Sequence, residues 1–219
     1  KLDIATGAET LLMVSEDADI FPIFSFKNGR AAELIGASFE YDQLGSHFRT
    51  EVQDKAASST IQGLLAAFPN KAVKLTSATA DNKLMILEVA SANDPRAFYL
   101  FDAEKKQIGF LLEAAPWFAN QAISQTQSIT YKARDGQEIV ALLTLPHDRE
   151  AKNLPLVLMP HGGPHGVRDS MSAMEDDAKV LAAHGYAVLQ PNFRAISRDD
   201  PPITQPTSTT FVILVPDPT

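Results

Sequence analysis

Cysteine is absent from the 219-residue sequence, which excludes disulfides and thiolate chemistry and leaves both the cytoplasm and the periplasm open as compartments. Positive charge is also scarce: 19 Lys and Arg stand against 27 Asp and Glu, a formal net charge of −8. We therefore expect no nucleic acid and no anionic membrane as partner. No apolar run approaches the roughly 20 residues that span a bilayer. An initiator methionine is missing as well, so we expect a chain cut at its start, and the lack of a leader does not define the compartment.

The first half of the sequence has the pattern of an antiparallel β meander. Short apolar segments at 20–26 and 32–41 flank Asn28-Gly29, a strong signal for a two-residue hairpin. Four more segments follow at 72–80, 84–91, 96–102 and 107–114, separated by short turn clusters. Strands of this length and spacing are typical of a propeller blade or of part of a sandwich.

One helix interrupts the predicted meander. Five apolar residues recur at helical spacing, and Pro69 follows them as a stop signal. They are Ala57, Ile61, Leu64, Leu65 and Phe68. We expect an amphipathic helix over 53–68 whose apolar face packs into the core.

The pattern changes after a polar, glutamine-rich stretch at 113–128, where Trp117 is interpreted as a packing residue at a domain junction. A hairpin around Asp135-Gly136 and a continuous apolar strand at 154–159 come next. Ser172 and Glu175 have the spacing of a capping box, which predicts a helix that starts near Ser172 and ends at Gly185. A buried strand at 186–193 completes a βαβ unit, so the sequence predicts an α/β domain.

The most informative segment is LVLMPHGGPHG (156–166), in which the apolar strand leads into His161, Gly162, Gly163 and Pro164. Ligands of open α/β sheets bind at the carboxyl ends of the strands, where this loop is expected. Two glycines leave backbone N–H groups open to a ligand, and an HGGG-type loop supplies one oxyanion donor in α/β-hydrolases. The segment therefore predicts an oxyanion site.

Other interpretations of this loop remain open. Gly-Gly-Pro after a strand is also compatible with a purely structural turn. A phosphate loop is disfavoured because no Gly-Lys-Ser/Thr follows. A zinc site at His161 and His165 is disfavoured because four-residue spacing has no helical meaning across Gly-Gly-Pro, and the motif holds no carboxylate ligand. We expect no metal and no cofactor.

Three segments together resemble the prolyl oligopeptidase family of serine peptidases, in particular its bacterial dipeptidyl-aminopeptidase and acylaminoacyl-peptidase branch. They are ITYKARDGQEIVALLTLP (129–146), LPLVLMPHGGPHGVRDS (154–170) and LAAHGYAVLQPNFR (181–194). The similarity runs from about Glu33 to Arg194. It implies the C-terminal part of a β-propeller at 1–118, a linker at 119–127 and the start of an α/β-hydrolase domain at 128–194. The Gly163 N–H is then the implied oxyanion donor, with His161, Gly162 and Pro164 shaping the loop.

The chain departs from the family after Arg194. Residues 195–219 form a divergent tail rich in Pro, Thr and Ser, and the sequence contains no Gly-x-Ser-x-Gly elbow. We expect the nucleophile, the acid and the base of the triad to be absent from this chain and the tail to pack poorly, although its FVILV segment (211–215) suits a sheet edge.

Two classes of function follow from these observations. The first is a peptide-hydrolysing serine peptidase represented by a truncated piece that is inactive alone. The second is a non-catalytic propeller or interaction protein, and an α/β-hydrolase esterase is an intermediate alternative.

Overall fold

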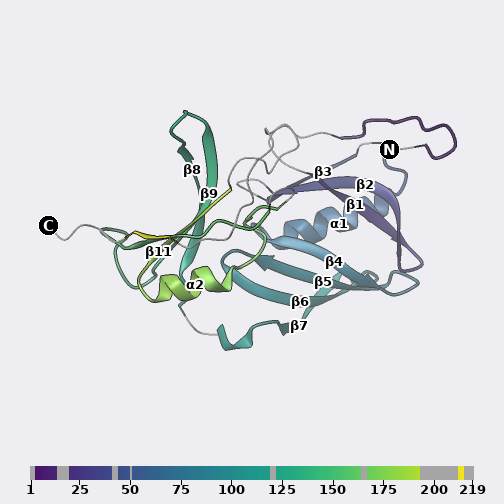
Figure 1. The fold of residues 1–219 in the computed structure, drawn as a ribbon. Helices are drawn as coiled ribbons and strands as arrows, with labels where there is room; N and C mark the ends of the chain where they lie inside the picture. Colours follow the sequence, from purple (N-terminus) through teal and green to yellow (C-terminus); the bar gives the residue numbers. More distant parts are fainter. Residues whose placement is uncertain are drawn as a thin grey trace.

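A computed structural model describes residues 3–13, 20–40, 44–49, 51–118, 122–163 and 167–192, and the backbone of 212–214. Within these ranges the chain forms three β-sheets, two α-helices and one short 3-10 helix. Figure 1 shows the first two sheets, with α1, on one side of the molecule and the third sheet, with α2, on the other. Neither α-helix in the described part is long and apolar enough to cross a membrane.

The first sheet is an antiparallel meander of β1 (Ile20–Lys27), β2 (Arg30–Glu40) and β3 (Leu44–Phe48). Asn28 and Gly29 connect β1 to β2 with φ angles of 51° and 70°. Positive φ at both central residues is the requirement of the two-residue turn that matches strand twist, so the predicted hairpin is confirmed.

Helix α1 (Lys55–Ala67) confirms the predicted amphipathic helix. The Asp54 side chain caps its first turn by accepting the Ala57 N–H at 2.8 Å, and the helix ends two residues before Pro69. Leu64 is 5% exposed and packs against the second sheet, with Phe68 beside it. The helix is therefore held by burial of one apolar face.

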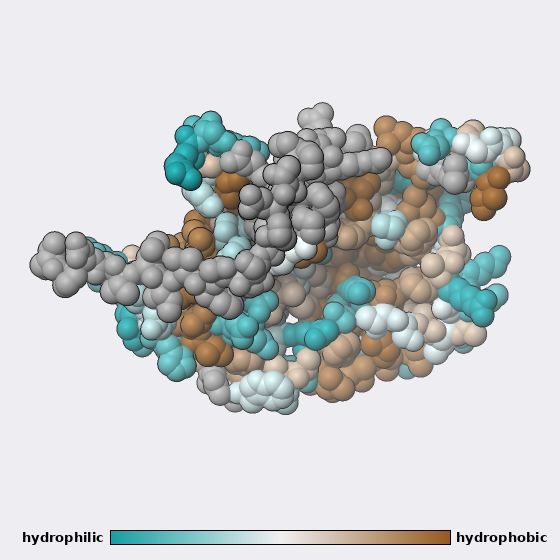
Figure 2. Space-filling view, in the orientation of Figure 1, coloured by the Kyte–Doolittle hydropathy of each residue, from teal (hydrophilic) through white to brown (hydrophobic). Residues whose placement is uncertain are grey.

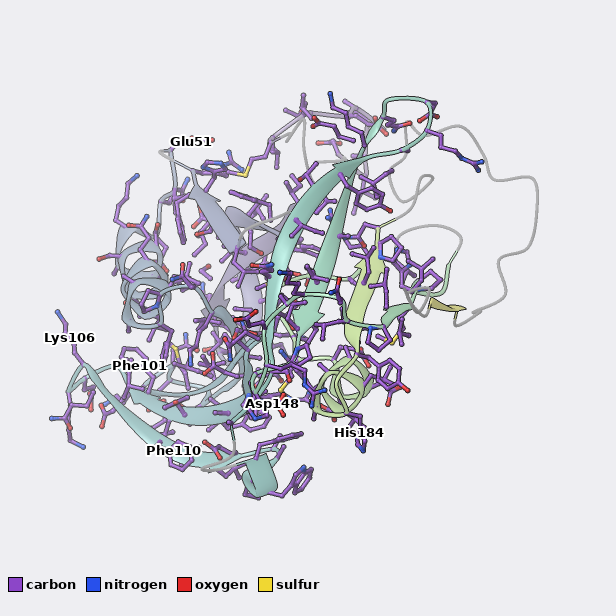
Figure 3. The ribbon with its side chains drawn as sticks, turned by 90° about the vertical axis from the view of Figure 1, so that its left-hand side faces the viewer. Glu51, Phe101, Lys106, Phe110, Asp148 and His184 are labelled. Carbon is purple, nitrogen blue, oxygen red and sulfur yellow. The ribbon has the colours of Figure 1, made fainter. Side chains whose placement is uncertain are left out.

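The second sheet is an antiparallel meander of β4 (Ala72–Ala78), β5 (Leu84–Ser91), β6 (Asp94–Asp102) and β7 (Gln107–Glu113). Its buried side chains form one cluster with α1: Leu64, Leu87, Val89 and Phe101. Strand β7 is the outer edge and keeps apolar side chains exposed, of which Phe110 is 59% exposed (Figure 3). Four short strands in this order have the form of one propeller blade.

The third sheet is mixed. It contains β8 (Gln125–Lys132), β9 (Glu138–Leu145), β10 (Leu156–Leu158), β11 (Ala187–Pro191) and β12 (Val212–Leu214) in the order β12-β10-β11-β9-β8. Only the β10–β11 pair is parallel, and α2 (Asp176–Ala183) lies between these two strands in the chain. The hairpin predicted around Asp135-Gly136 is confirmed as the β8–β9 connection.

The predicted capping box at the start of helix α2 is wrong. The helix begins at Asp176, and its N-cap Glu175 makes no side-chain capping bond. Ser172 does not cap it, because the Ser172 hydroxyl lies 2.6 Å from the Ser170 hydroxyl and is used there. The predicted end is confirmed: Gly185 has φ +95°, and a Cβ added there would meet the Arg149 guanidinium.

The junction between the second and third sheets contains the 3-10 helix η1 (Pro116–Phe118). The prediction that Trp117 packs at this junction is wrong, because its side chain is 65% exposed. The expected edge strand in the tail is present: the backbone of 212–214 pairs antiparallel with β10. The other tail residues, 195–211 and 215–219, lie outside the described residues.

Candidate functional site

Strand β10 positions the glycine loop. Val157 at its centre is 2% exposed, and the Met159 N–H donates to the Leu189 carbonyl at 2.8 Å, which continues the parallel ladder one residue past the strand. Val157 and Met159 pack against Ala178 of α2 and Val188 of β11. The segment 161–163 therefore leaves the carboxyl end of a strand that is fixed on both sides.

The loop exposes two backbone amides. Gly162 and Gly163 are both exposed, and within the described residues neither N–H has a hydrogen-bond acceptor. The Gly162 carbonyl accepts from His161 Nδ1 at 2.5 Å, and a Cβ at Gly162 would meet nothing within 4 Å. Pro164, the fourth loop residue singled out in the sequence, lies outside the described residues, as does His165. The loop can thus offer N–H donors to an outside acceptor.

Asp169 lies next to the loop, although eight residues separate it from His161. Burial raises the pKa of the Asp169 carboxyl, and electrostatic interactions with His161 and Arg168 and a hydrogen bond with Gln190 act against this rise. Carboxylate oxygen Oδ2 of Asp169 is buried and has no hydrogen-bond partner among the described residues. The carboxyl therefore takes up a proton more readily than an exposed aspartate does.

Asn192 connects the end of β11 to the segment after the glycine loop. Its side-chain oxygen accepts the Asp169 N–H at 2.9 Å, and its side-chain nitrogen donates to the Asp169 carbonyl at 2.9 Å. Its own N–H donates to the Val140 carbonyl of β9 at 2.9 Å. Two reciprocal bonds from one amide group fix the backbone at Asp169, and with it the exit of the loop.

Three contacts join this region to the first two sheets. The Ser170 hydroxyl donates to Glu40 Oε2 at 2.9 Å, and the Ala92 N–H donates to the Met171 carbonyl at 2.9 Å. The third contact is made by Lys179 of α2, which reaches Asn93 at the turn between β5 and β6. Residues 167–172 are therefore fixed from both sides of the junction.

Sequence reasoning found the loop but not its surroundings. Asp169 and Lys179 carried no motif, and only their position in space relates them to the loop. Asn192 was read as part of the buried strand at 186–193, where its pairing with Asp169 had no sequence signal. In the described ranges, no three His, Asp or Glu side chains come together in a way that could hold a metal ion.

One cavity is separate from the loop. It has a volume of about 820 Å³ and is lined by β1, α1, β4 and β5 residues and by Ser172, Met174 and Asp176 at the start of α2. Figure 2 shows brown, apolar side chains gathered on this face over the first two sheets. Since no residue of 161–163 lines the cavity, we do not assign it to the chemistry of the loop.

Comparison with known proteins supplies the context for this geometry. No protein-family model matches the chain. Dipeptidyl peptidase family member 6 of Caenorhabditis elegans is 24% identical in an alignment 164 residues long, which covers 65% of this chain and 22% of that protein. The chain is thus similar in sequence to part of a dipeptidyl peptidase.

Solved structures of these peptidases share the fold. Dipeptidyl peptidase 4 of Porphyromonas gingivalis matches with a TM-score of 0.56 and 13% identity over 88% of this chain and 27% of that chain. A prolyl endopeptidase structure gives a TM-score of 0.54 and 15% identity over 91% of this chain and 28% of that chain. An acylaminoacyl peptidase in complex with a chloromethyl ketone matches with a TM-score of 0.50 and 16% identity, over 84% of this chain and 27% of that chain.

The chain thus spans about a fifth of the curated relative and about a quarter of the solved structures that it matches. Its antiparallel sheets and few helices are consistent with the propeller-like part of prolyl oligopeptidase-family peptidases.

Proposed function

We propose that this chain is a piece of a serine peptidase of the prolyl oligopeptidase type, which hydrolyses short peptides by acyl transfer. In this proposal residues 1–118 are the C-terminal part of a β-propeller, 119–127 a linker and 128–194 the start of an α/β-hydrolase domain. The relationship to dipeptidyl, prolyl and acylaminoacyl peptidases supports it.

The observation that carries the proposal is the pair of amides at Gly162 and Gly163. They lie at the carboxyl end of a strand in a parallel pair, and within the described residues they have no acceptor of their own. This is the place where α/β-hydrolases build one half of an oxyanion hole. A hydrogen-bonded turn would use one of these amides within the turn itself.

The Gly163 N–H acts on the transition state in this mechanism. When a nucleophile attacks the scissile carbonyl, negative charge develops on the carbonyl oxygen, and a preorganised N–H donor stabilises it. His161 restrains the loop through its bond to the Gly162 carbonyl. The serine nucleophile, the proton-transferring histidine and its acid partner come from outside this chain, which contains no Gly-x-Ser-x-Gly sequence. Acyl transfer of this kind needs no cofactor.

A loop graft tests the proposal. Residues 156–166 replace the equivalent segment of an active prolyl oligopeptidase-family peptidase, and kcat and KM are measured on a peptide reporter. We expect the graft to keep kcat within about tenfold of the parent. Gly163→Val in the graft should lower kcat by about 10²–10³-fold, because removing an oxyanion donor has this effect, and KM should change little.

Met159→Leu is the matched control. It changes a buried side chain in the same segment at nearly constant volume, so kcat should stay within about twofold. A graft whose activity is insensitive to Gly163→Val would show that this loop does not act as an oxyanion donor.

A further inference from the structure

Lys179 is a lysine in the protein interior. Its residue is 4% exposed, on a helix whose neighbouring residues Ala178 and Ala182 are fully buried. Lysine is almost never fully buried unless its charge is satisfied, so an apolar residue would be the ordinary choice here. The side chain must therefore have a specific set of partners.

Two chain segments supply those partners. Lys179 Nζ donates to Thr126 Oγ1 at 2.6 Å, to the Ser124 carbonyl at 2.7 Å and to Asn93 Oδ1 at 3.2 Å. Asn93 lies at the turn between β5 and β6, whereas Ser124 and Thr126 lie at the start of β8. The three donor positions of one ammonium group are thus matched by three acceptors.

The acceptors are themselves held in place. Asn93 exchanges two hydrogen bonds with the backbone of Thr126: its Oδ1 accepts the Thr126 N–H at 2.7 Å, and its Nδ2 donates to the Thr126 carbonyl at 2.9 Å. The Thr126 hydroxyl lies 2.8 Å from the Thr144 hydroxyl of β9. We call Lys179, Asn93, Ser124 and Thr126 the lysine cluster.

In the part of the chain that the structure describes, no carboxylate forms an ion pair with the ammonium. Among the described residues, Asp94 is the acidic group whose charge acts on Lys179, but its own bonds go to Lys71 at 3.0 Å and to the Ser91 hydroxyl at 2.7 Å. Neutral oxygens give the ammonium hydrogen bonds but not the attraction of an ion pair. Because these oxygens belong to two different sheets, their bonds to Lys179 fix the position of one sheet relative to the other.

Residues next to the lysine cluster contact the segments on either side of the glycine loop. Ala178, next to Lys179, packs against Val157 and Met159 of the strand that leads into the loop. The Ala92 N–H, next to Asn93, donates to the carbonyl of Met171 on the far side of the loop. The turn between β5 and β6 thus contacts Met171 directly, and α2 connects it to the strand before the loop. In Figure 1, α2 lies between the ends of β5 and β6 and the strand β11.

We propose that Lys179 is a positioning residue that fixes the glycine-loop segment and its sheet onto the turn between β5 and β6. The inference concerns how two parts of the chain are held together, so it does not depend on the catalytic role of the loop.

Hydrogen exchange of the purified chain tests this proposal at two amides, Ala92 and Thr126, whose bonds cross the junction. Lys179→Met keeps the length of the side chain and removes its donors. We expect exchange at both amides to become at least about tenfold faster, while the β5–β6 ladder between Leu84 and Ser91 stays within about twofold. Lys132→Met is the matched control, because Lys132 is an exposed lysine on β8, and it should change neither amide.

Asn93→Ala is the second variant, since it removes an acceptor at a turn and leaves the helix interior intact. If both residues act through one cluster, the double variant should lose little more protection than either single variant. Losses that multiply in the double variant would show two independent structural effects and overturn the proposal. Unchanged exchange at Ala92 and Thr126 in Asn93→Ala would also overturn the proposal. This test holds even if Lys179→Met unfolds the chain.

Discussion

At the scale of single residues, some residues near the loop are recognisable from a sequence motif, and others only from their position in the tertiary structure. Gly162 and Gly163 could be assigned from the sequence because a strand, two glycines and a proline predict a loop with open amides. Asp169 and Lys179 could not, since an aspartate and a lysine in a polar sequence are ordinarily solvated. Their burial follows from the docking of the sheets, which no local pattern records.

The buried ammonium gives a prediction about pH. Burial lowers the pKa of Lys179 from 10.5 to about 8, whereas in the unfolded chain the group returns to its ordinary value. Between these two values the folded state binds fewer protons than the unfolded state, so the free energy of unfolding should rise with pH across this window. Since one pKa unit corresponds to about 1.4 kcal/mol, the full rise is about 3 kcal/mol. Below pH 8 the group is charged in both states and contributes no slope.

Urea unfolding followed by circular dichroism at several pH values from about 7.5 to 10 measures this rise. Lysines and tyrosines ordinarily titrate near the upper end of this pH range. The measurement therefore compares the pH dependence of the free energy of unfolding between the native chain and Lys179→Met. The variant should lack the rise, and Lys132→Met should keep it. Equal slopes in all three chains would mean that folding does not lower the pKa of Lys179.

At the scale of elements, the spacing of apolar residues predicted the position of a helix better than the local capping signal did. Helix α1 lies where its apolar spacing placed it, because burial of Leu64 against β5 and β6 decides its position. The start of α2 was misplaced, because the capping box relied on two side chains alone. Ser172 bonds to Ser170, which in turn reaches Glu40 across the junction, and this tertiary contact overrides the local signal.

Helix α1 should be sensitive at one position. Leu64→Ala removes a side chain that is 5% exposed and sits in the centre of the cluster with Leu87 and Phe101. Truncation of a buried leucine costs about 2–5 kcal/mol, so the urea midpoint should fall clearly at an unchanged slope. Ser59→Ala, on the exposed side of the same helix, should leave the midpoint unchanged or slightly higher. Equal midpoints for the two variants would contradict the packing of α1 on the second sheet.

At the scale of the whole molecule, two antiparallel meanders and a mixed sheet share one chain. The order of strands within each meander follows from the turns between neighbours and could be predicted. The antiparallel pairing of β12 on β10 and the contacts from Glu40 and Asn93 to the third sheet could not, because they join residues far apart in sequence.

The proposed function predicts that the chain alone is inactive. Purified chain should not hydrolyse aminoacyl or acyl-aminoacyl reporters above background, because an oxyanion donor without an activated nucleophile performs no acyl transfer. A fluorophosphonate probe should label none of its serines. Stoichiometric labelling of one serine, with turnover that Gly163→Val abolishes, would reveal a complete active site and contradict the assignment of a missing nucleophile.

The separation in sequence of the junction contacts also sets an order of events during folding. Strands of the first two sheets pair with their chain neighbours, whereas the bond from Lys179 to Asn93 spans 86 residues and that from Ser170 to Glu40 spans 130. Contacts that close long loops form after local ones, because the entropy of loop closure must be offset first. We therefore expect each meander to assemble before the third sheet docks and the lysine cluster to be among the last parts of the molecule to form.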